Sequence, residues 1–153
     1  RAAIAEGTEL GLRAKDIIDR GDLVSDDIIV DMVAARIDDN DCAKGVILDG
    51  FPRTVTQAYA LDEMLSGKGL ALDCFIQIEV DDASLFARIE NRAAKTGGAR
   101  ADDNAATLRR RLAVYHERTA PLLPYYANKG VLKSVDGMSS VDDVASQIDR
   151  ILG

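Results

Sequence analysis

The chain has 153 residues, with 26 acidic against 19 basic side chains, and a formal net charge of −7 at pH 7. An apolar fraction of 47% excludes an intrinsically disordered protein, and the acidic balance argues against a general nucleic-acid binder. Two cysteines cannot make a disulfide scaffold or a four-thiolate zinc site, so we expect reduced, half-buried thiols, and no apolar run reaches the roughly 20 residues of a membrane span.

Helical periodicity and capping residues predict three helices in the first 38 residues. The chain opens in helical register at residues 1–6 and stops at Gly7, which indicates a start partway into a longer protein. We expect a second helix over residues 8–20. A third is expected over residues 26–38, with Ser25 as its N-cap.

Three short apolar runs then predict strands, at residues 46–48, 74–80 and 131–135. Four more helices are expected, over residues 54–66, 81–92, 105–126 and 140–151. Pro121 and Pro124 should disturb the long one. Strands that alternate with helices indicate an α/β protein with a parallel sheet.

A carboxylate and a guanidinium follow the first predicted strand, in the run Asp49-Gly50-Phe51-Pro52-Arg53. Ligands of an open parallel sheet lie beyond the carboxyl ends of its strands. There Asp49 can orient a hydrated Mg²⁺, Gly50 lets a ligand approach the backbone, and Arg53 can bind a phosphate. The alternative interpretation is that Asp49 caps the next helix and Arg53 pairs with it.

This run, with its flanks, resembles the signature of the adenylate kinases: Val46 through Arg53, followed by Gln57 four residues later. Other stretches that resemble the family occur in the same order along the chain. They are residues 21–24, 100–103, 108–112 with Tyr115, 119–122 with 125–126, and 135–137. The resemblance therefore covers essentially the whole chain.

The resemblance implies an α/β fold: a three-layer, P-loop NTPase-like parallel sheet flanked by helices, with a helical insert for the nucleoside monophosphate. It assigns residues 1–24 to the monophosphate-binding region, 25–92 and 102–153 to the core, and 93–101 to a short lid. A short lid without cysteine implies no zinc. The first strand, P-loop and first helix of the family are absent here, so we expect no phosphoryl transfer from a molecule that begins at Arg1.

The implied activity is reversible phosphoryl transfer, ATP + AMP to two ADP, with Mg²⁺, in adenine nucleotide homeostasis. The resemblance also implies a cytoplasmic monomer that binds neither nucleic acid nor membranes. A UMP/CMP-type kinase is the nearest rival, and Gln57 favours AMP because the pyrimidine enzymes tend to carry Asn there. A non-catalytic AMP-binding fragment is a third hypothesis, supported by the absent P-loop.

Such enzymes catalyse phosphoryl transfer mainly by positioning donor and acceptor and by placing positive charge around the migrating group, so arginines dominate the implied site. The catalytic set is Asp49, which would orient the water shell of Mg²⁺, together with Arg53, Arg88, Arg92, Arg100 and Arg111. The AMP-binding set is Arg1, Asp22, Leu23, Val24, Gly50, Phe51, Pro52, Arg53, Gln57, Arg100 and Arg111. The ATP-binding set is Arg88, Arg92 and Ser139.

Several of these residues have a simpler interpretation. Arg88 and Arg92 lie four apart on one predicted helix face, where arginines are usually solvated or paired. Of the three arginines at 109–111 only one can face a cleft, because consecutive helix residues point about 100° apart. His116 and the two cysteines are by default structural residues.

Overall fold

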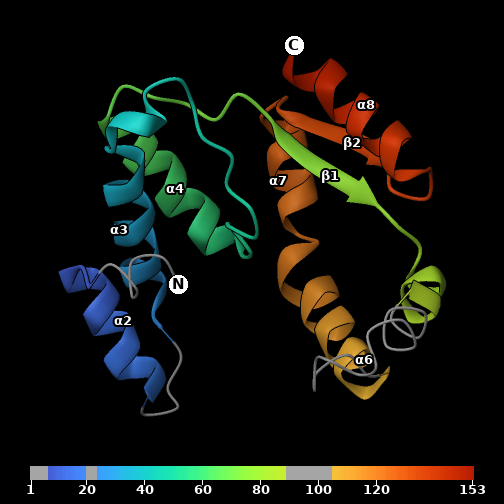
Figure 1. The fold of residues 1–153 in the computed structure, drawn as a ribbon, viewed down its shortest axis with the longest axis horizontal. Helices are drawn as coiled ribbons and strands as arrows, with labels where there is room; N and C mark the ends of the chain where they lie inside the picture. The colour runs from blue at the N-terminus through green and yellow to red at the C-terminus, as the bar shows by residue number, and fades with distance from the viewer. Residues whose placement is uncertain (1–6, 20–23, 89–104) are drawn as a thin grey trace. The chain divides into compact units, whose positions relative to one another are not determined.

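The computed structural model describes residues 7–19, 24–88 and 105–153, and the chain divides into two compact units (Figure 1). The first unit is Arg1–Ala71 and the second is Leu72–Gly153. The described residues of the first unit form helices, whereas those of the second form the two strands and further helices.

Three α-helices build the first unit: α2 (Glu9–Asp19), α3 (Asp26–Ile37) and α4 (Val55–Gly67). Helix α3 packs against both of the others, and a short 3₁₀ turn, η1 (Asn40–Cys42), follows it. Small and branched apolar side chains from all three helices are buried: Ala14, Ile28, Ala58, Leu61 and Leu65. The three helices predicted at 8–20, 26–38 and 54–66 are confirmed to within about a residue in the described chain.

Helix α4 owes both of its ends to local hydrogen bonds. Thr54 is the N-cap, and its hydroxyl accepts the backbone N–H of Gln57 at 3.2 Å. At the other end Gly69 has a φ of +69°, and its N–H bonds the carbonyl of Ser66. The N–H of Leu70 reaches back to Leu65, which completes a Schellman motif.

The strand predicted at residues 46–48 is not formed. These residues have no assigned secondary structure and pair with no strand among the described residues, and Val46 and Ile47 are 42% and 83% exposed. A strand is defined by hydrogen bonds to a neighbouring strand, which an apolar run alone does not supply. The prediction of a strand from the apolar pattern is therefore wrong at these residues.

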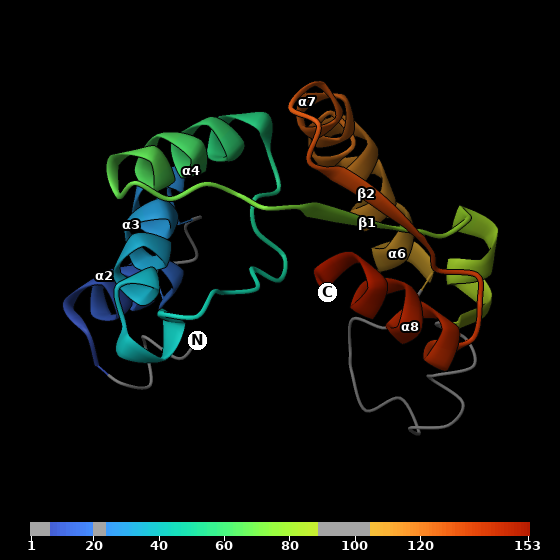
Figure 2. The same ribbon diagram turned by 90° about the horizontal axis from the view of Figure 1, so that it is seen from above.

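The second unit is built around two parallel strands, β1 (Phe75–Glu79) and β2 (Leu132–Asp136), in register from Phe75↔Leu132 to Glu79↔Asp136. They confirm the strands predicted at 74–80 and 131–135. Helices α7 (Leu122–Asn128) and α8 (Val141–Leu152) contact β2 and lie on opposite sides of the strands (Figure 2).

The core of this unit is an aromatic stack. Tyr126 of α7 is fully buried, and its ring lies 4.4 Å from that of Phe75 in β1, centroid to centroid. Leu122 of α7 and Val135 of β2 are also buried. The sheet and α7 are therefore joined by apolar contact, the main stabilising term in a small core.

The helix predicted over residues 105–126 is instead three segments: α6 (Ala105–Val114), a π-helical turn η2 (Tyr115–Thr119) and α7. The N–H of Ala120 bonds the carbonyl of Tyr115, five residues back, which widens the helix. Pro121 then stands at the N-cap of α7, where the missing N–H costs nothing. The helix is interrupted just before Pro121, which confirms the expected disturbance.

Side-chain caps begin the two remaining helices, which were predicted over 81–92 and 140–151, and residues 89–92 of the first lie outside the described chain. Asp81 accepts the N–H of Ser84 at 2.8 Å and begins a helix at residues 82–88. Ser140 accepts the N–H of Asp143 at 3.2 Å and begins α8. In the part of the chain described, no helix is both long enough and apolar enough to cross a bilayer.

Candidate active site

Residues 49–53 form a tight turn that folds back on the side chain of Arg53. Its Nε–H donates to the carbonyl oxygen of Gly50 at 2.7 Å. Gly50 has a φ of +74°, and a Cβ placed on it would lie 3.0 Å from Nη2 of Arg53. The Phe51–Pro52 peptide bond within the turn is cis. Glycine is therefore needed at position 50 for both the backbone angle and the close approach of the guanidinium.

The amide of Gln57 ties this turn to helix α3. Its Oε1 accepts the backbone N–H of Arg53 at 2.8 Å, and its Nε2 donates to Oδ1 of Asp26 at 2.6 Å. The residue is 7% exposed and is the one buried polar residue of the described chain. Gly50, Arg53 and Gln57, all predicted from the signature, are brought together, whereas Asp26 was not foreseen.

The remaining predicted residues of this turn differ in exposure. Phe51 is half-buried, Pro52 is buried and Asp49 is exposed. The alternative in which Asp49 caps the following helix is wrong, because Thr54 occupies the N-cap of α4. An exposed carboxylate is compatible with Mg²⁺, which keeps several waters and usually takes one or two protein carboxylates besides the nucleotide phosphates.

Several predicted residues lie outside the described chain: Arg1, Asp22, Leu23, Arg92, Arg100 and the whole lid at 93–101. Val24 is described, is half-buried, and directly precedes Ser25 and α3.

A second group of predicted residues meets in the turn that follows β2. Nη2 of Arg88 donates to the carbonyl oxygen of Gly137 at 2.7 Å. In the same turn Asp136 accepts the hydroxyl of Ser139 at 2.8 Å and the N–H of Met138 at 2.9 Å. The Ser139 hydroxyl and the Met138 N–H hold the pKa of the Asp136 carboxyl below its ordinary value. Arg88 of helix 82–88 therefore contacts the turn that carries Ser139.

The three arginines of α6, Arg109, Arg110 and Arg111, are all exposed. The guanidinium carbon of Arg109 lies 5.7 Å from the ring centroid of Phe86. His116 Nε2 lies 2.9 Å from Oδ2 of Asp82. Two side-chain contacts thus tie α6 and η2 to helix 82–88, which carries Arg88. No sequence pattern marked either contact, because more than 20 residues separate the partners.

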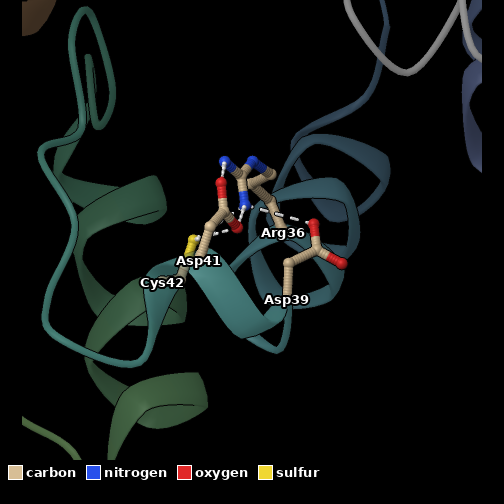
Figure 3. Close-up of polar contacts among 4 residues, drawn as sticks. All are labelled: Arg36, Asp39, Asp41 and Cys42. Carbon is tan, nitrogen blue, oxygen red and sulfur yellow. Dashed lines mark hydrogen bonds and ion pairs between the residues drawn. The ribbon is translucent and has the colours of Figure 1, made fainter.

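A surface cluster of Arg36, Asp39, Asp41 and Cys42 joins the end of α3 to η1 (Figure 3). Nη1 and Nη2 of Arg36 each donate to the Asp41 carboxylate at 2.7 Å, and Nη1 also contacts Asp39 at 3.2 Å. Nη1 further lies 2.8 Å from the sulfur of Cys42, a free and half-buried thiol. Cys42, expected only to pack, thus has polar partners.

The charges of this cluster change the titration of its members. Hydrogen bonding to Arg36 lowers the pKa of the Asp41 carboxyl. Burial raises the pKa of the Cys42 thiol, and the Arg36 charge opposes that rise. Within the described chain no three His, Cys, Asp or Glu side chains come together as a metal site.

Comparison with known proteins decides the family. The family model described as adenylate kinase matches residues 1–131. The chain belongs to the adenylate kinase family. It is 56% identical to the adenylate kinase of Parvibaculum lavamentivorans over 154 residues, covering 100% of this chain and 75% of that protein. It is 54% identical to the adenylate kinase of Sinorhizobium medicae over 156 residues, covering 99% of this chain and 81% of the relative.

A further relative, the adenylate kinase of Brucella ovis, is 52% identical over 156 residues, which cover 99% of this chain and 80% of the length of the relative. These relatives confirm the resemblance drawn from residues 46–57. As a member of this family, the protein is an enzyme, a phosphotransferase with adenylate kinase function. Its fold is a helix-rich α/β fold with a small parallel sheet.

Proposed function

We propose that this protein catalyses the reversible, Mg²⁺-dependent transfer of a phosphoryl group between ATP and AMP, giving two ADP. Family membership carries the proposal, since the kinase relatives are 52–56% identical over nearly the whole chain. The turn at Gly50 and Arg53 supports the proposal independently. The hydrogen bond from Arg53 to the carbonyl oxygen of Gly50 fixes the guanidinium in place, which preorganises it for a phosphate.

The AMP site is proposed in the first unit. Arg53 holds the phosphate, Gln57 hydrogen-bonds the edge of the base, and the backbone near Val24 lies against the nucleoside. The contact between Asp26 and Gln57 supports this assignment, since it links the residues after Val24 to the turn. By resemblance the site is completed by Arg1, Asp22, Leu23, Gly50, Phe51, Pro52, Arg100 and Arg111.

The ATP site is proposed in the second unit. Arg88 and the backbone near Ser139 bind the adenine end, and Arg92 contacts the phosphates. The hydrogen bond from Arg88 to Gly137 supports the pairing of helix 82–88 with the turn after β2. By resemblance Arg100 and Arg111 surround the phosphoryl group in transfer, where positive charge stabilises the transition state.

Asp49 is proposed to orient the water shell of Mg²⁺. When bound, Mg²⁺ neutralises phosphate charge and aligns the oxygens that react. The protein's own contribution is a carboxylate that stays exposed and lies four residues from Arg53. No protein-bound zinc is proposed. We also propose a monomer in the cytoplasm that binds neither nucleic acid nor membranes, and light scattering would test its mass.

The decisive experiment is a coupled assay on the protein at its native length, with AMP, CMP and UMP as acceptors. AMP should be the best acceptor, and Arg53→Met should raise the KM for AMP by about tenfold or more, since it removes charged hydrogen bonds. Arg13→Met, an exposed arginine of α2, is the matched control. Faster turnover with CMP or UMP would identify the rival pyrimidine kinase, and no turnover at all would favour a non-catalytic AMP-binding protein.

A further inference from the structure

The contact between Asp26 and Gln57 joins two helices across 31 residues of sequence. Asp26 is the first residue of α3, and Gln57 lies in the first turn of α4. The distance from Gln57 Nε2 to Asp26 Oδ1 is 2.6 Å, the shortest of the three hydrogen bonds that Gln57 makes to Asp26, Arg53 and Thr54. Its acceptor is a carboxylate, and hydrogen bonds to an ionised acceptor are stronger than those between neutral groups.

The two partners of the Gln57 amide permit only one orientation of it. The backbone N–H of Arg53 can only donate, so it must face the amide oxygen. The carboxylate of Asp26 can only accept when ionised, so it must face the amide nitrogen. A rotation of the amide by 180° would oppose donor to donor and acceptor to acceptor.

This orientation leaves Gln57 with one N–H and one oxygen lone pair for a ligand. An amide nitrogen has two hydrogens and its oxygen two lone pairs, and each atom already makes one bond. The edge of a 6-amino purine offers an acceptor at N1 and a donor at the amino group. The edge of a 6-oxo purine offers the reverse order, which would require the rotated amide.

We propose that Asp26 is a positioning residue that makes the monophosphate site select 6-amino over 6-oxo purines, by holding the amide of Gln57 in one orientation. This inference rests on the proposed function, in which Gln57 reads the base of AMP. Asp26 should contribute more than the Arg53 N–H, because a charge-assisted hydrogen bond is roughly twice as strong as a neutral one. Its place in the first turn of α3 is also favoured by the helix dipole.

The test compares AMP with inosine monophosphate, which differs from AMP in having the 6-oxo base. The quantity measured is the ratio of kcat/KM for the two acceptors, with the protein at its native length. Asp26→Asn keeps the size of the side chain but offers either a donor or an acceptor, so the ratio should fall about fivefold. Asp26→Ala removes the partner and should lower the ratio at least as much.

Asp27→Asn is the matched control, because Asp27 is the next residue of the same turn and its carboxylate bonds the Ser25 hydroxyl rather than Gln57. It should leave the ratio within about twofold of wild type. A purely structural role for Asp26 would lower kcat/KM for both nucleotides equally. Ratios for both Asp26 variants that match the control would overturn the inference, as would unfolding of both variants while Asp27→Asn stays folded.

Gln57→Leu separates this inference from the proposed function. If Gln57→Leu raises the KM for AMP about tenfold while the Asp26 variants keep the wild-type ratio, only the role of Asp26 is wrong. If Gln57→Leu leaves the KM for AMP unchanged, or the wild-type protein does not use AMP, the proposed site is wrong and the inference falls with it.

Discussion

The guanidinium of Arg88 donates a 2.7 Å hydrogen bond to the carbonyl oxygen of Gly137, 49 residues further along the chain. This bond connects the helix at 82–88 to the turn after β2. Three predictions about the second unit follow from this turn, and a fourth concerns the surface cluster of the first unit.

Arg88→Met should weaken ATP without a comparable effect on AMP. Under the proposed function Arg88 contacts ATP, and its bond to Gly137 holds the turn that carries Ser139. We expect the KM for ATP to rise about tenfold and the KM for AMP to change less than about twofold. Steady-state kinetics with each substrate varied in turn measure both. Arg150→Met, an exposed arginine of α8, is the control, and an equal rise for both nucleotides would contradict the assignment.

Gly137→Ala should destabilise the protein through a steric clash. A Cβ at this position would lie 2.5 Å from Cγ2 of Ile78 and 2.8 Å from the carbonyl oxygen of Glu79. Because β1 cannot move without losing its pairing with β2, we expect a loss of about 1–3 kcal/mol in the free energy of unfolding. Urea denaturation measures it.

Gly67→Ala is the matched control for that substitution. Gly67 is the last residue of α4, and a Cβ on it would meet nothing within 4 Å. The same change should there be neutral or stabilising by up to about 1 kcal/mol, because it restricts the unfolded chain. Equal destabilisation at both glycines would show that the clash at Gly137 is not the cause.

Asp136 should make stability depend on pH in the acid range. Its folded pKa lies below the ordinary value of 3.8 because the Ser139 hydroxyl and the Met138 N–H bond the carboxylate. A lowered pKa stabilises the folded state at neutral pH, and that stabilisation is lost as the pH falls through the folded pKa. The difference in unfolding free energy between wild type and Asp136→Asn should therefore shrink below about pH 4.

Urea titrations at several pH values between 7 and 3 measure this difference. Ser139→Ala removes the first partner of the carboxylate and should raise its pKa toward the ordinary value, which an NMR titration of Asp136 would follow. A wild-type advantage that stays constant down to pH 3 would count against the role of these hydrogen bonds.

The thiol of Cys42 should be less reactive than a free cysteine, and still less so without Arg36. Burial raises its pKa and the nearby guanidinium opposes that rise, so Arg36→Met should move the midpoint of alkylation to higher pH. Iodoacetamide rates against pH, in a Cys74→Ser background, measure the midpoint. Lys44→Met, a nearby exposed cation, should leave it unchanged, and a lower midpoint in Arg36→Met would refute the prediction.

Local signals predicted most of the helices well. Thr54, Asp81 and Ser140 each place a side-chain oxygen within three residues of the N–H that it accepts. Such bonds depend on neighbouring residues alone, so the pattern of residues is sufficient to predict them. Strand pairing depends on atoms that are distant in the sequence, which is why the run at 46–48 was predicted as a strand that it does not form. The π-helical turn at 115–119 was not predicted within the helix at 105–126.

The contacts of the candidate site also fall into those that the local sequence predicts and those that depend on tertiary packing. The signature from Asp49 to Gln57 was sufficient to select Gly50, Arg53 and Gln57, because the turn and the first turn of α4 that unite them lie within nine consecutive residues. No spacing rule connects Asp26 to Gln57, or Arg88 to Gly137, since these partners meet only after their helices and strands have packed.

The sequence by itself therefore determined the family, most of the helices and the turn from Gly50 to Arg53 with its partner Gln57. Only the tertiary structure decided how the Gln57 amide is oriented and which backbone carbonyl Arg88 contacts. The physical reason is that a motif specifies which groups can form hydrogen bonds, whereas the packing of α3 on α4, and of the strands with their flanking helices, selects the partners.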